Sequence, residues 1–218
     1  MRGDKLIIQP WHVRAAQQMA ELVIPRIMNS TGRFVISIGG ESGSGKSEIA
    51  AALSATLAER GIPSIILQQD DYFIYPPRTN ERMRRQDINH VGIGEVHLDL
   101  LDRNLGDISN GGKEITKPLV IFDQDRITRE TISLDGVKTI IVDGTYTTAL
   151  RNVDCRVFID CTHIHTRAAR RQRARETQDA YLERVLAIEH EVISAHKQYA
   201  DIIITADYEV EENEAKHE

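Results

Sequence analysis

The stretch GGESGSGKSE, residues 39–48, decides the fold of this chain. It follows the apolar run FVISI (34–38) and leads into the alanine-rich segment SEIAAALSATLAER (47–60). Residues 40–47 match the pattern G-x-x-x-x-G-K-[ST] at every fixed position. Between a strand and a helix, such glycines let the backbone turn its N–H groups inward, and the helix start adds a positive dipole end. The stretch therefore predicts a cradle for the phosphates of a nucleotide.

The pattern also assigns expected roles to side chains of this loop. We expect the phosphates to be held by Gly40, Ser42, Gly43, Ser44, Gly45, Lys46 and Ser47. The ammonium group of Lys46 can reach the β- and γ-phosphates, and the hydroxyl of Ser47 can ligate Mg²⁺. The chain contains no N-K-x-D guanine motif and no L-S-G-G-type transporter signature. Kinases of small molecules therefore remain as the expected class.

The length of the chain suits one α/β domain, and its composition is that of an ordinary soluble protein. Its 218 residues are 41% hydrophobic and 28% charged. The net charge of −6 gives no reason to expect binding to nucleic acid or to an anionic membrane. No apolar run approaches the roughly 20 residues of a membrane span, and the N-terminus has no stretch typical of a signal peptide. Cys155 and Cys161 fit free thiols, so we expect a cytoplasmic protein.

Short, uniformly apolar runs alternate with helical segments along the chain. The predicted strands are 34–38, 62–67, 137–142, 156–159 and 201–205. Besides the helix at 47–60, helices are predicted at about 164–175 and 178–198. Uniformly apolar strands are typical of parallel sheets that are covered on both faces. We therefore predict an α/β fold, a doubly wound parallel sheet of the phosphate-loop class, over residues 31–208. Residues 111–134 predict a small β-hairpin inserted above the sheet.

The two ends of the chain look like additions to this domain. In residues 1–30, six apolar side chains share one helical face: Val13, Ala16, Ala20, Val23, Ile24 and Ile27. We expect this helical extension to pack on the domain or on another subunit. In the second case the protein would form a homo-oligomer. Residues 209–218 form an acidic tail, for which we expect a frayed chain.

Acidic residues follow two of the predicted strands. Asp70 and Asp71 come after 62–67, and Asp143 follows 137–142. Parallel strands end at the ligand crevice, so these carboxylates are expected beside the phosphate loop. Asp70 can orient an acceptor hydroxyl, and Asp143 occupies the usual second Mg²⁺ position of phosphate-loop enzymes. A helix cap or a solvated turn is the alternative for each.

Five arginines fall within nine residues after the fourth predicted strand. On a helix, Arg167, Arg170, Arg171 and Arg175 share a face, whereas Arg173 points elsewhere. A lid at about 163–178 could bring such groups to the transferring phosphoryl group. A solvated basic helix and a nucleic-acid patch are the alternatives, and the negative total charge weighs against the second. His90, in the segment after Asp70, is a further candidate to face the acceptor.

Taken together, the segments from about residue 33 to 206 resemble the uridine kinase and phosphoribulokinase family. QDDYF (69–73) looks like the family's Q-D-S-F-Y segment, in which the first Asp is the base for the acceptor hydroxyl. FIDCT (158–162), with the Thr-Arg and Arg-Arg pairs that follow, looks like its strand and arginine lid. KQYADII (197–203) is similar to its K-x-Y-A-D-x-I-I segment.

The resemblance implies ATP, Mg²⁺ and phosphorylation of a hydroxyl on a small molecule. Its implied catalytic residues are Asp70, Lys46, Arg170, Arg171 and Arg173, with Arg167 on the nucleotide and Ser47, Asp70 and Asp143 near the metal. Its implied acceptor contacts are Asp71, Tyr72, His90, Phe122, Asp123 and Arg126. The chain departs from the family where uridine kinases have Tyr-Asp and then His-Ser-Arg, because residues 122–126 are FDQDR. The resemblance thus implies the catalytic residues of the family but does not define which acceptor is phosphorylated.

Three functions are compatible with these patterns. The leading hypothesis is an ATP-dependent kinase for a nucleoside-like or sugar-like acceptor. A sugar-phosphate kinase would need extra cations, which Arg82, Arg84 and Arg85 could supply, although a solvated helix face also explains them. The third is a regulator that binds ATP and transfers nothing. The arginine lid and the carboxylate at residue 70 favour the enzyme over the regulator.

Overall fold

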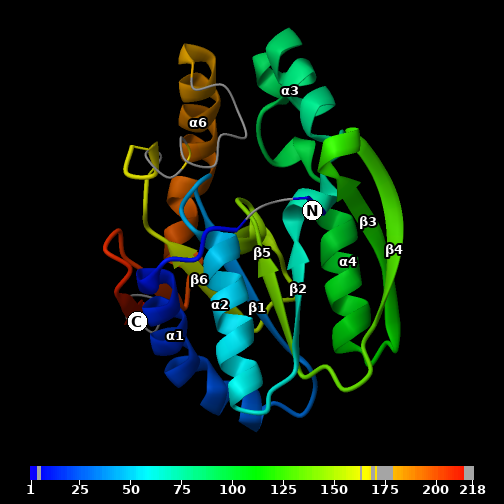
Figure 1. Cartoon of the computed structure of the whole chain (residues 1–218), viewed down its shortest axis with the longest axis vertical. Helices are drawn as coiled ribbons and strands as arrows, with labels where there is room; N and C mark the ends of the chain where they lie inside the picture. Colours follow the sequence, from blue (N-terminus) through cyan, green and yellow to red (C-terminus); the bar gives the residue numbers. More distant parts are fainter. Residues whose placement is uncertain (4–5, 163, 168–169, 171–178, 214–218) are drawn as a thin grey trace.

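Figure 1 shows the computed structural model, which describes residues 1–3, 6–162, 164–167, 170 and 179–213. Its main sheet has the strand order β2-β5-β1-β6-β7-β8. The strands are β1 (Phe34–Gly40), β2 (Ser64–Gln68), β5 (Thr139–Asp143), β6 (Cys155–Ile159), β7 (Ile202–Ile204) and β8 (Val210–Glu212). The first five are parallel, and β8 pairs antiparallel with β7. The predicted mostly parallel α/β sheet is confirmed.

Helices cover the sheet, and two of them stand above its carboxyl edge (Figure 1). They are α1 (Pro10–Asn29), α2 (Lys46–Glu59), α3 (Pro77–Gln86), α4 (Leu98–Ser109) and α6 (Ala180–Ile193). The predicted helix 178–198 is confirmed as α6, which continues into the 3₁₀ turns of Ser194–Tyr199. Most of the predicted helix 164–175 lies outside the described residues. The described chain contains no helix with the length and apolarity that a membrane crossing requires.

The core is divided between the two faces of the sheet. Successive side chains of a strand point to opposite faces. Ile36 and Ile38 of β1 therefore pack in the cluster that contains α1 and α2. Val35 of the same strand, with Ile140 and Val142 of β5, packs in the cluster that contains α4. Because both faces are covered, the strands are apolar at nearly every position, which is the pattern seen in the sequence.

The N-terminal helix packs on α2 of its own chain. Ala16, Ala20, Val23 and Ile27, which the periodicity predicts to be apolar contacts, are fully buried in the cluster with α2. Val13 is 38% exposed, so it lies at the edge of this face. No second subunit is needed to cover the helix, and the homo-oligomer stays a prediction.

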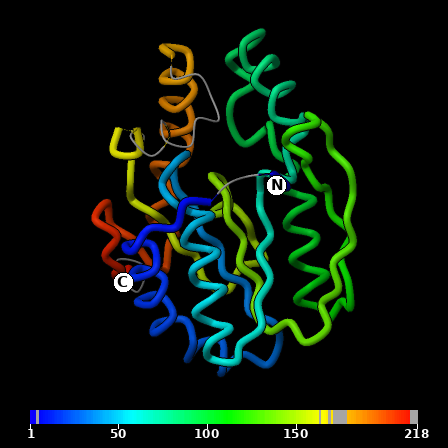
Figure 2. The backbone as a smooth tube through the Cα atoms, viewed as in Figure 1, coloured from blue at the N-terminus to red at the C-terminus, as the bar shows by residue number. Residues whose placement is uncertain are grey.

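The insertion at residues 111–134 is the predicted hairpin. It consists of β3 (Glu114–Ile121) and β4 (Arg126–Ser133), which form a separate two-stranded sheet. Figure 2 shows it as a green loop of tube beside α4, away from the central strands. The hairpin therefore stands next to the carboxyl edge of the sheet without joining it.

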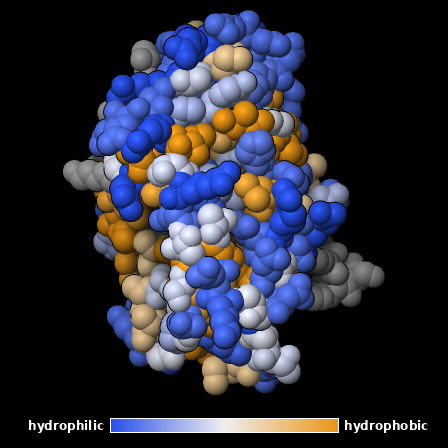
Figure 3. Space-filling view, turned by 90° about the vertical axis from the view of Figure 1, so that its right-hand side faces the viewer, coloured by the Kyte–Doolittle hydropathy of each residue, from blue (hydrophilic) through white to orange (hydrophobic). Residues whose placement is uncertain are grey.

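Two further features concern the surface and the C-terminal segment. Figure 3 shows hydrophilic side chains at the height of α3 and a band of hydrophobic ones just below them, where α3 meets the upper end of the hairpin.

The prediction of a frayed tail from residue 209 was wrong for its first part, because Val210–Glu212 form β8. The free edge of β7 supplies the backbone partners that this acidic segment needs. Residues 214–218 lie outside the described part.

Candidate active site

The phosphate loop joins the end of β1 to the start of α2. Gly40, Gly43 and Gly45 have φ angles of +145°, +81° and +87°, which residues with a Cβ rarely adopt. A Cβ at Gly43 would also lie 2.6 Å from Cγ of Arg170. Because α2 begins at Lys46, the N–H groups and the positive dipole end of its first turn lie at the loop. The backbone thus has the curvature and the donors that a phosphate cradle needs.

Ser47 and Asp143 meet between α2 and β5. The Ser47 hydroxyl donates a hydrogen bond to Asp143 Oδ2 at 2.5 Å. Asp143 is only 4% exposed, and its Oδ1 accepts no hydrogen bond within the described residues. Burial raises the pKa of Asp143 to about 6; the Ser47 hydrogen bond opposes this rise and the nearby Asp70 carboxylate adds to it. A divalent cation would compensate this buried charge.

The donor atoms of this corner fit Mg²⁺ and a triphosphate. In the described part of the chain, no three His, Cys, Asp or Glu side chains are grouped as a metal cage. Mg²⁺ typically takes one or two carboxylates, with phosphates and water as its other ligands. Ser47 and Asp143, with Asp70 nearby, supply such a set. The buried hydroxyl of Ser44 also lacks a hydrogen-bond partner among the described residues, as expected where an anion would accept it.

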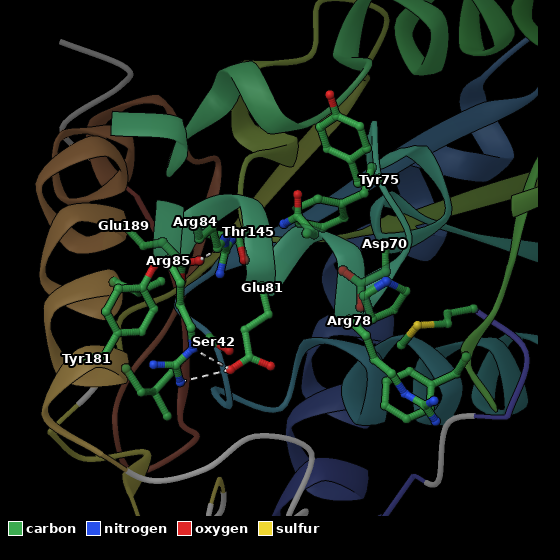
Figure 4. A pocket seen from close by; sticks show the side chains of 17 residues that line it. Ser42, Asp70, Tyr75, Arg78, Glu81, Arg84, Arg85, Thr145, Tyr181 and Glu189 are labelled. Atoms are coloured by element: carbon green, nitrogen blue, oxygen red, sulfur yellow. Dashed lines mark hydrogen bonds and ion pairs between the residues drawn. The ribbon is translucent and has the colours of Figure 1, made fainter. Parts of the chain in front are cut away.

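Asp70 lies in the 3₁₀ turn Gln69–Tyr72 that follows β2. The register of the sheet places Gln68 of β2 beside Asp143 of β5, so the turn starts at the same edge as the predicted metal position. Asp70 lines a pocket to which the phosphate loop contributes Ser42 and the end of β5 contributes Thr145 (Figure 4). The carboxylate and the phosphate loop thus face one cavity.

Comparisons with known proteins agree with this geometry. The sequence profile described as the phosphoribulokinase/uridine kinase family matches residues 35–211. The chain belongs to this family. It is 31% identical to a uridine kinase from Staphylococcus epidermidis over 192 residues, covering 81% of this chain and 88% of that protein. The fold is shared with a structure described as a possible uridine kinase from Bacillus stearothermophilus, with a TM-score of 0.66, 20% identity, and coverage of 87% and 97% of the two chains.

A further relative has two activities in its name. The chain is 28% identical over 198 residues to the bifunctional alpha-galactosidase/sucrose kinase AgaSK from Mediterraneibacter gnavus. The match covers 84% of this chain but only 21% of that protein. The family match thus includes relatives named for a nucleoside and for a sugar, and it leaves the acceptor of this member open.

Asp71, which was predicted to contact the acceptor, does not line the pocket. Its carboxylate accepts hydrogen bonds from Lys117 Nζ at 2.6 Å and from the Val120 backbone N–H at 3.0 Å. The amino group of Met1 lies 3.2 Å from the same carboxylate, and Lys117 also pairs with Glu130 at 2.8 Å. Asp71 and Lys117 are both buried. Asp71 therefore anchors the hairpin to the turn that follows β2, and its predicted contact with the acceptor is corrected.

Tyr72 and His90 also lie outside the pocket. Tyr72 is fully buried in the core, where its hydroxyl accepts a hydrogen bond from Asn104 Nδ2 at 2.8 Å, so its predicted acceptor contact is corrected. Nε2 of His90 lies 3.2 Å from Oδ1 of Asn80, and its ring centroid lies 5.7 Å from that of Tyr75. His90 therefore supports two pocket-lining residues and does not line the pocket itself.

Only one of the three hairpin residues predicted to contact the acceptor lines the pocket. Phe122, at the end of β3, does so. Asp123 is exposed, and its backbone carbonyl accepts a hydrogen bond from Arg78 Nη2 at 3.4 Å. Arg126 is exposed at the start of β4. The turn of the hairpin therefore points Asp123 and Arg126 to the surface.

Among the lid arginines that the structure describes, Arg167 and Arg170, it is Arg170 that reaches the phosphate loop. It is 5% exposed and donates a hydrogen bond to the Thr166 hydroxyl, which in turn donates to the Ser42 carbonyl at 3.0 Å. Arg167 is exposed, and its Nε lies 3.6 Å from Glu183 Oε1. The predicted catalytic residues Arg171 and Arg173, with most of the lid, lie outside the described residues.

A buried ion cluster centred on Arg84 was not predicted. Arg84 Nε and Nη2 lie 2.5 Å and 3.0 Å from the two carboxylate oxygens of Glu95, and Nη2 lies 3.1 Å from Glu189 of α6. Asn80 donates a further hydrogen bond to Glu95, which is fully buried. Burial alone would lower the pKa of Arg84, but Glu189 and Glu95 raise it above its ordinary value. No local pattern in the sequence reveals these partners.

Its neighbour Arg85 joins α3 to α6 at the surface. Arg85 Nη2 lies 2.9 Å from Glu81 and 3.1 Å from Asp179, and its guanidinium carbon lies 4.4 Å from the ring centroid of Tyr181. Figure 4 shows the Arg85–Glu81 pair with Tyr181 beside it. Arg82 donates to the Thr79 hydroxyl. The three arginines considered for a phosphorylated acceptor are thus engaged within the protein.

Helix α6 also contacts the phosphate loop. His190, which follows Glu189, has its Nδ1 2.5 Å from Glu41 Oε1. Glu41 is a loop residue, and its backbone carbonyl accepts a hydrogen bond from Lys46 Nζ at 2.7 Å. Successive residues of α6 therefore bind α3 and the phosphate loop.

Proposed function

We propose that the protein is an ATP-dependent kinase that transfers the γ-phosphoryl group to a hydroxyl of a nucleoside-like or sugar-like acceptor. The observation that carries this proposal is the pocket shared by Asp70 and Ser42, because it joins a carboxylate and the phosphate loop at one cavity. The names of the relatives, a uridine kinase and a sucrose kinase, support both kinds of acceptor.

Each of the chain's own groups has a task in this proposal. The N–H groups of the loop and Lys46 hold the triphosphate, and Ser47 and Asp143 hold Mg²⁺, which neutralises phosphate charge when bound. Asp70 orients the acceptor hydroxyl and accepts its proton. Arg170, packed against the loop, adds positive charge beside the phosphates.

The groups around the pocket favour an uncharged acceptor. Three arginines among the described residues line the pocket. Arg84 and Arg85 are each bound to two carboxylates, and Arg78 donates to the Asp123 carbonyl at 3.4 Å beside the Asp125 carboxylate. Four aromatic side chains also line it: Phe73, Tyr75, Phe122 and Tyr181. Aromatic rings of this kind stack on planar bases and bury the apolar faces of small molecules. We therefore favour a nucleoside or a sugar over a sugar phosphate.

A coupled ADP-release screen over nucleosides, sugars, sugar phosphates and vitamin precursors tests this function. With an accepted substrate, Asp70→Asn should lower turnover by about 10²- to 10⁴-fold, the contribution of a general base, and leave ATP affinity within about twofold. Asp123→Asn, an exposed acid outside the pocket, is the matched control and should keep the wild-type rate. A wild-type rate for Asp70→Asn would refute the assigned role. ATP binding without any phosphorylated product would favour the regulator.

We also propose that the protein works in the cytoplasm. Cys155 and Cys161 are both buried and form no disulfide within the described residues, which suits a reducing compartment. Burial raises the pKa of Cys161 to about 11, so this thiol stays protonated and reacts slowly at neutral pH.

A further inference from the structure

An aromatic cluster covers the side of the phosphate loop that is remote from Asp70. It consists of Trp11 and His12 at the start of α1 and Tyr208 after β7, with ring centroids 5.0–6.3 Å apart. The Tyr208 hydroxyl donates a hydrogen bond to the Ser44 carbonyl at 3.2 Å. Nε2 of His12 lies 2.8 Å from the position that a Cβ would have at Gly45. The cluster therefore touches the loop directly.

The three rings differ in exposure: His12 is buried, Tyr208 is partly buried and Trp11 is exposed. His12 is 6% exposed, and its Nδ1 accepts a hydrogen bond from the Gln9 backbone N–H at 3.1 Å. Tyr208 has a left-handed backbone with φ of +62°, a costly conformation for a bulky residue that is typical of functional segments. Trp11 is 42% exposed, although a large aromatic side chain gains most from burial.

The order of the strands gives the direction in which a bound nucleotide extends. Asp70 and Asp143 follow β2 and β5, which lie on one side of β1. The γ-phosphate has to face these carboxylates, so the nucleoside end points to the other side, toward β6 and β7. The segment after β7, with Tyr208, and the start of α1 lie there side by side (Figure 2). They are joined by the Arg14–Glu209 ion pair at 3.2 Å.

We propose that Trp11 and Tyr208 form the nucleobase end of the donor site, with the exposed face of Trp11 stacking on the base. This inference rests on the proposed function, because it needs a nucleotide in the phosphate loop. Residues 1–34, which include Trp11, lie outside the family match, so this wall of the site is contributed by the N-terminal extension of this chain. His12 and the Tyr208 hydroxyl hold the rings against the loop, so that base and phosphates are bound as one unit.

The chain offers a direct probe, because Trp11 is its only tryptophan. Titration of the full chain with Mg·ATP, Mg·ADP and inorganic triphosphate, with tryptophan fluorescence as the readout, should change the emission with the two nucleotides only. Competition with labelled ATP in equilibrium dialysis shows that triphosphate occupies the loop. Nucleotide binding that leaves the emission unchanged would overturn the inference.

Variants separate base stacking from support of the loop. Trp11→Ala should weaken ATP about 5- to 150-fold, the range expected for one base–aromatic stack, and leave the affinity for triphosphate unchanged. Trp11→Phe should recover most of the ATP affinity. Met28→Ala, an exposed apolar residue at the far end of α1, is the matched control and should bind ATP as the wild type does.

The outcomes distinguish this inference from the proposed function. An equal loss of ATP and triphosphate affinity in Trp11→Ala, or no loss of either, would overturn the stacking role while leaving the kinase assignment in place. Retained ATP affinity and fluorescence change without any phosphorylated product would overturn the kinase assignment alone. Absence of ATP binding by the wild type would overturn both.

Discussion

Replacing Arg84 by methionine would remove the centre of the buried cluster that joins α3 to α6. The substitution keeps an unbranched apolar stem and deletes the charge. It leaves the fully buried Glu95 with the hydrogen bonds from Asn80 and the Gly92 backbone N–H, and it separates Glu189 from α3. The free energy of unfolding should fall because a buried carboxylate loses its counter-charge.

The expected loss is large for a single side chain. Removing one partner of a buried ion pair costs about 3–5 kcal/mol. For a chain of this size, each kcal/mol lowers the melting temperature by about 2–4 °C, so Arg84→Met should melt roughly 6–20 °C below the wild type. Arg85→Met, next along the same helix, is the matched control. Its ion pairs are at the surface and its contact with Tyr181 is half-exposed, so its loss of stability should be much smaller than that of Arg84→Met.

Urea and thermal unfolding of both variants, followed by circular dichroism, measure this difference. The double variant Arg84→Met/Glu95→Gln should be more stable than Arg84→Met alone, because it removes the uncompensated carboxylate as well. Equal stability of Arg84→Met and Arg85→Met would refute the reasoning. So would a double variant whose loss is the sum of the two single losses.

Two further predictions concern other buried charges. Lys117→Met should lower the free energy of unfolding by about 3 kcal/mol, which is at the low end for a buried ion pair because Asp71 keeps its hydrogen bond from the Val120 N–H. The variant should also lower turnover more than it raises the KM for ATP, since Asp71 fixes the turn that carries Asp70. A loss of stability with unchanged turnover would show that this anchor does not influence catalysis. Burial would raise the pKa of Asp102, but hydrogen bonds from Asn152 and Arg151 lower it overall. Its contribution is therefore complete above its ordinary pKa of about 3.9 and is lost as the pH falls through the lower folded value. The stability gap between the wild type and Asp102→Asn, measured by urea unfolding across pH, should close below about pH 4; a gap that does not change with pH would contradict this.

The parts of the fold that depend on local pattern could be predicted from the sequence. The glycines and lysine of the phosphate loop lie within ten residues, and the strands are marked by short apolar runs. The prediction of the hairpin rested on the same kind of signal, Gly111 and Gly112 before two short runs. The added strand β8 could not be predicted, because its backbone partners lie on β7 and its own sequence is acidic.

The direction of the side chains after β2 could not be predicted either. Residues 69–72 form a 3₁₀ turn, in which successive side chains are about 120° apart. Asp70 therefore faces the pocket, Asp71 the hairpin and Tyr72 the core, although the three are consecutive and were all assigned to the site. The partners of Arg84 were missed for a related reason, since Glu189 is more than one hundred residues away in the chain.

The contacts of α6 bear on how the two substrates influence each other. Glu189 and His190 are neighbours on one rigid helix, and they hold α3 and the phosphate loop respectively. On the proposed function, α6 connects the wall of the acceptor pocket to the loop that holds the nucleotide, so a coupling of the two sites through this helix would act on both. Thermodynamic reciprocity then requires that the factor by which bound nucleotide changes acceptor affinity is the factor by which bound acceptor changes nucleotide affinity. The helix is therefore the element through which the two affinities would be linked.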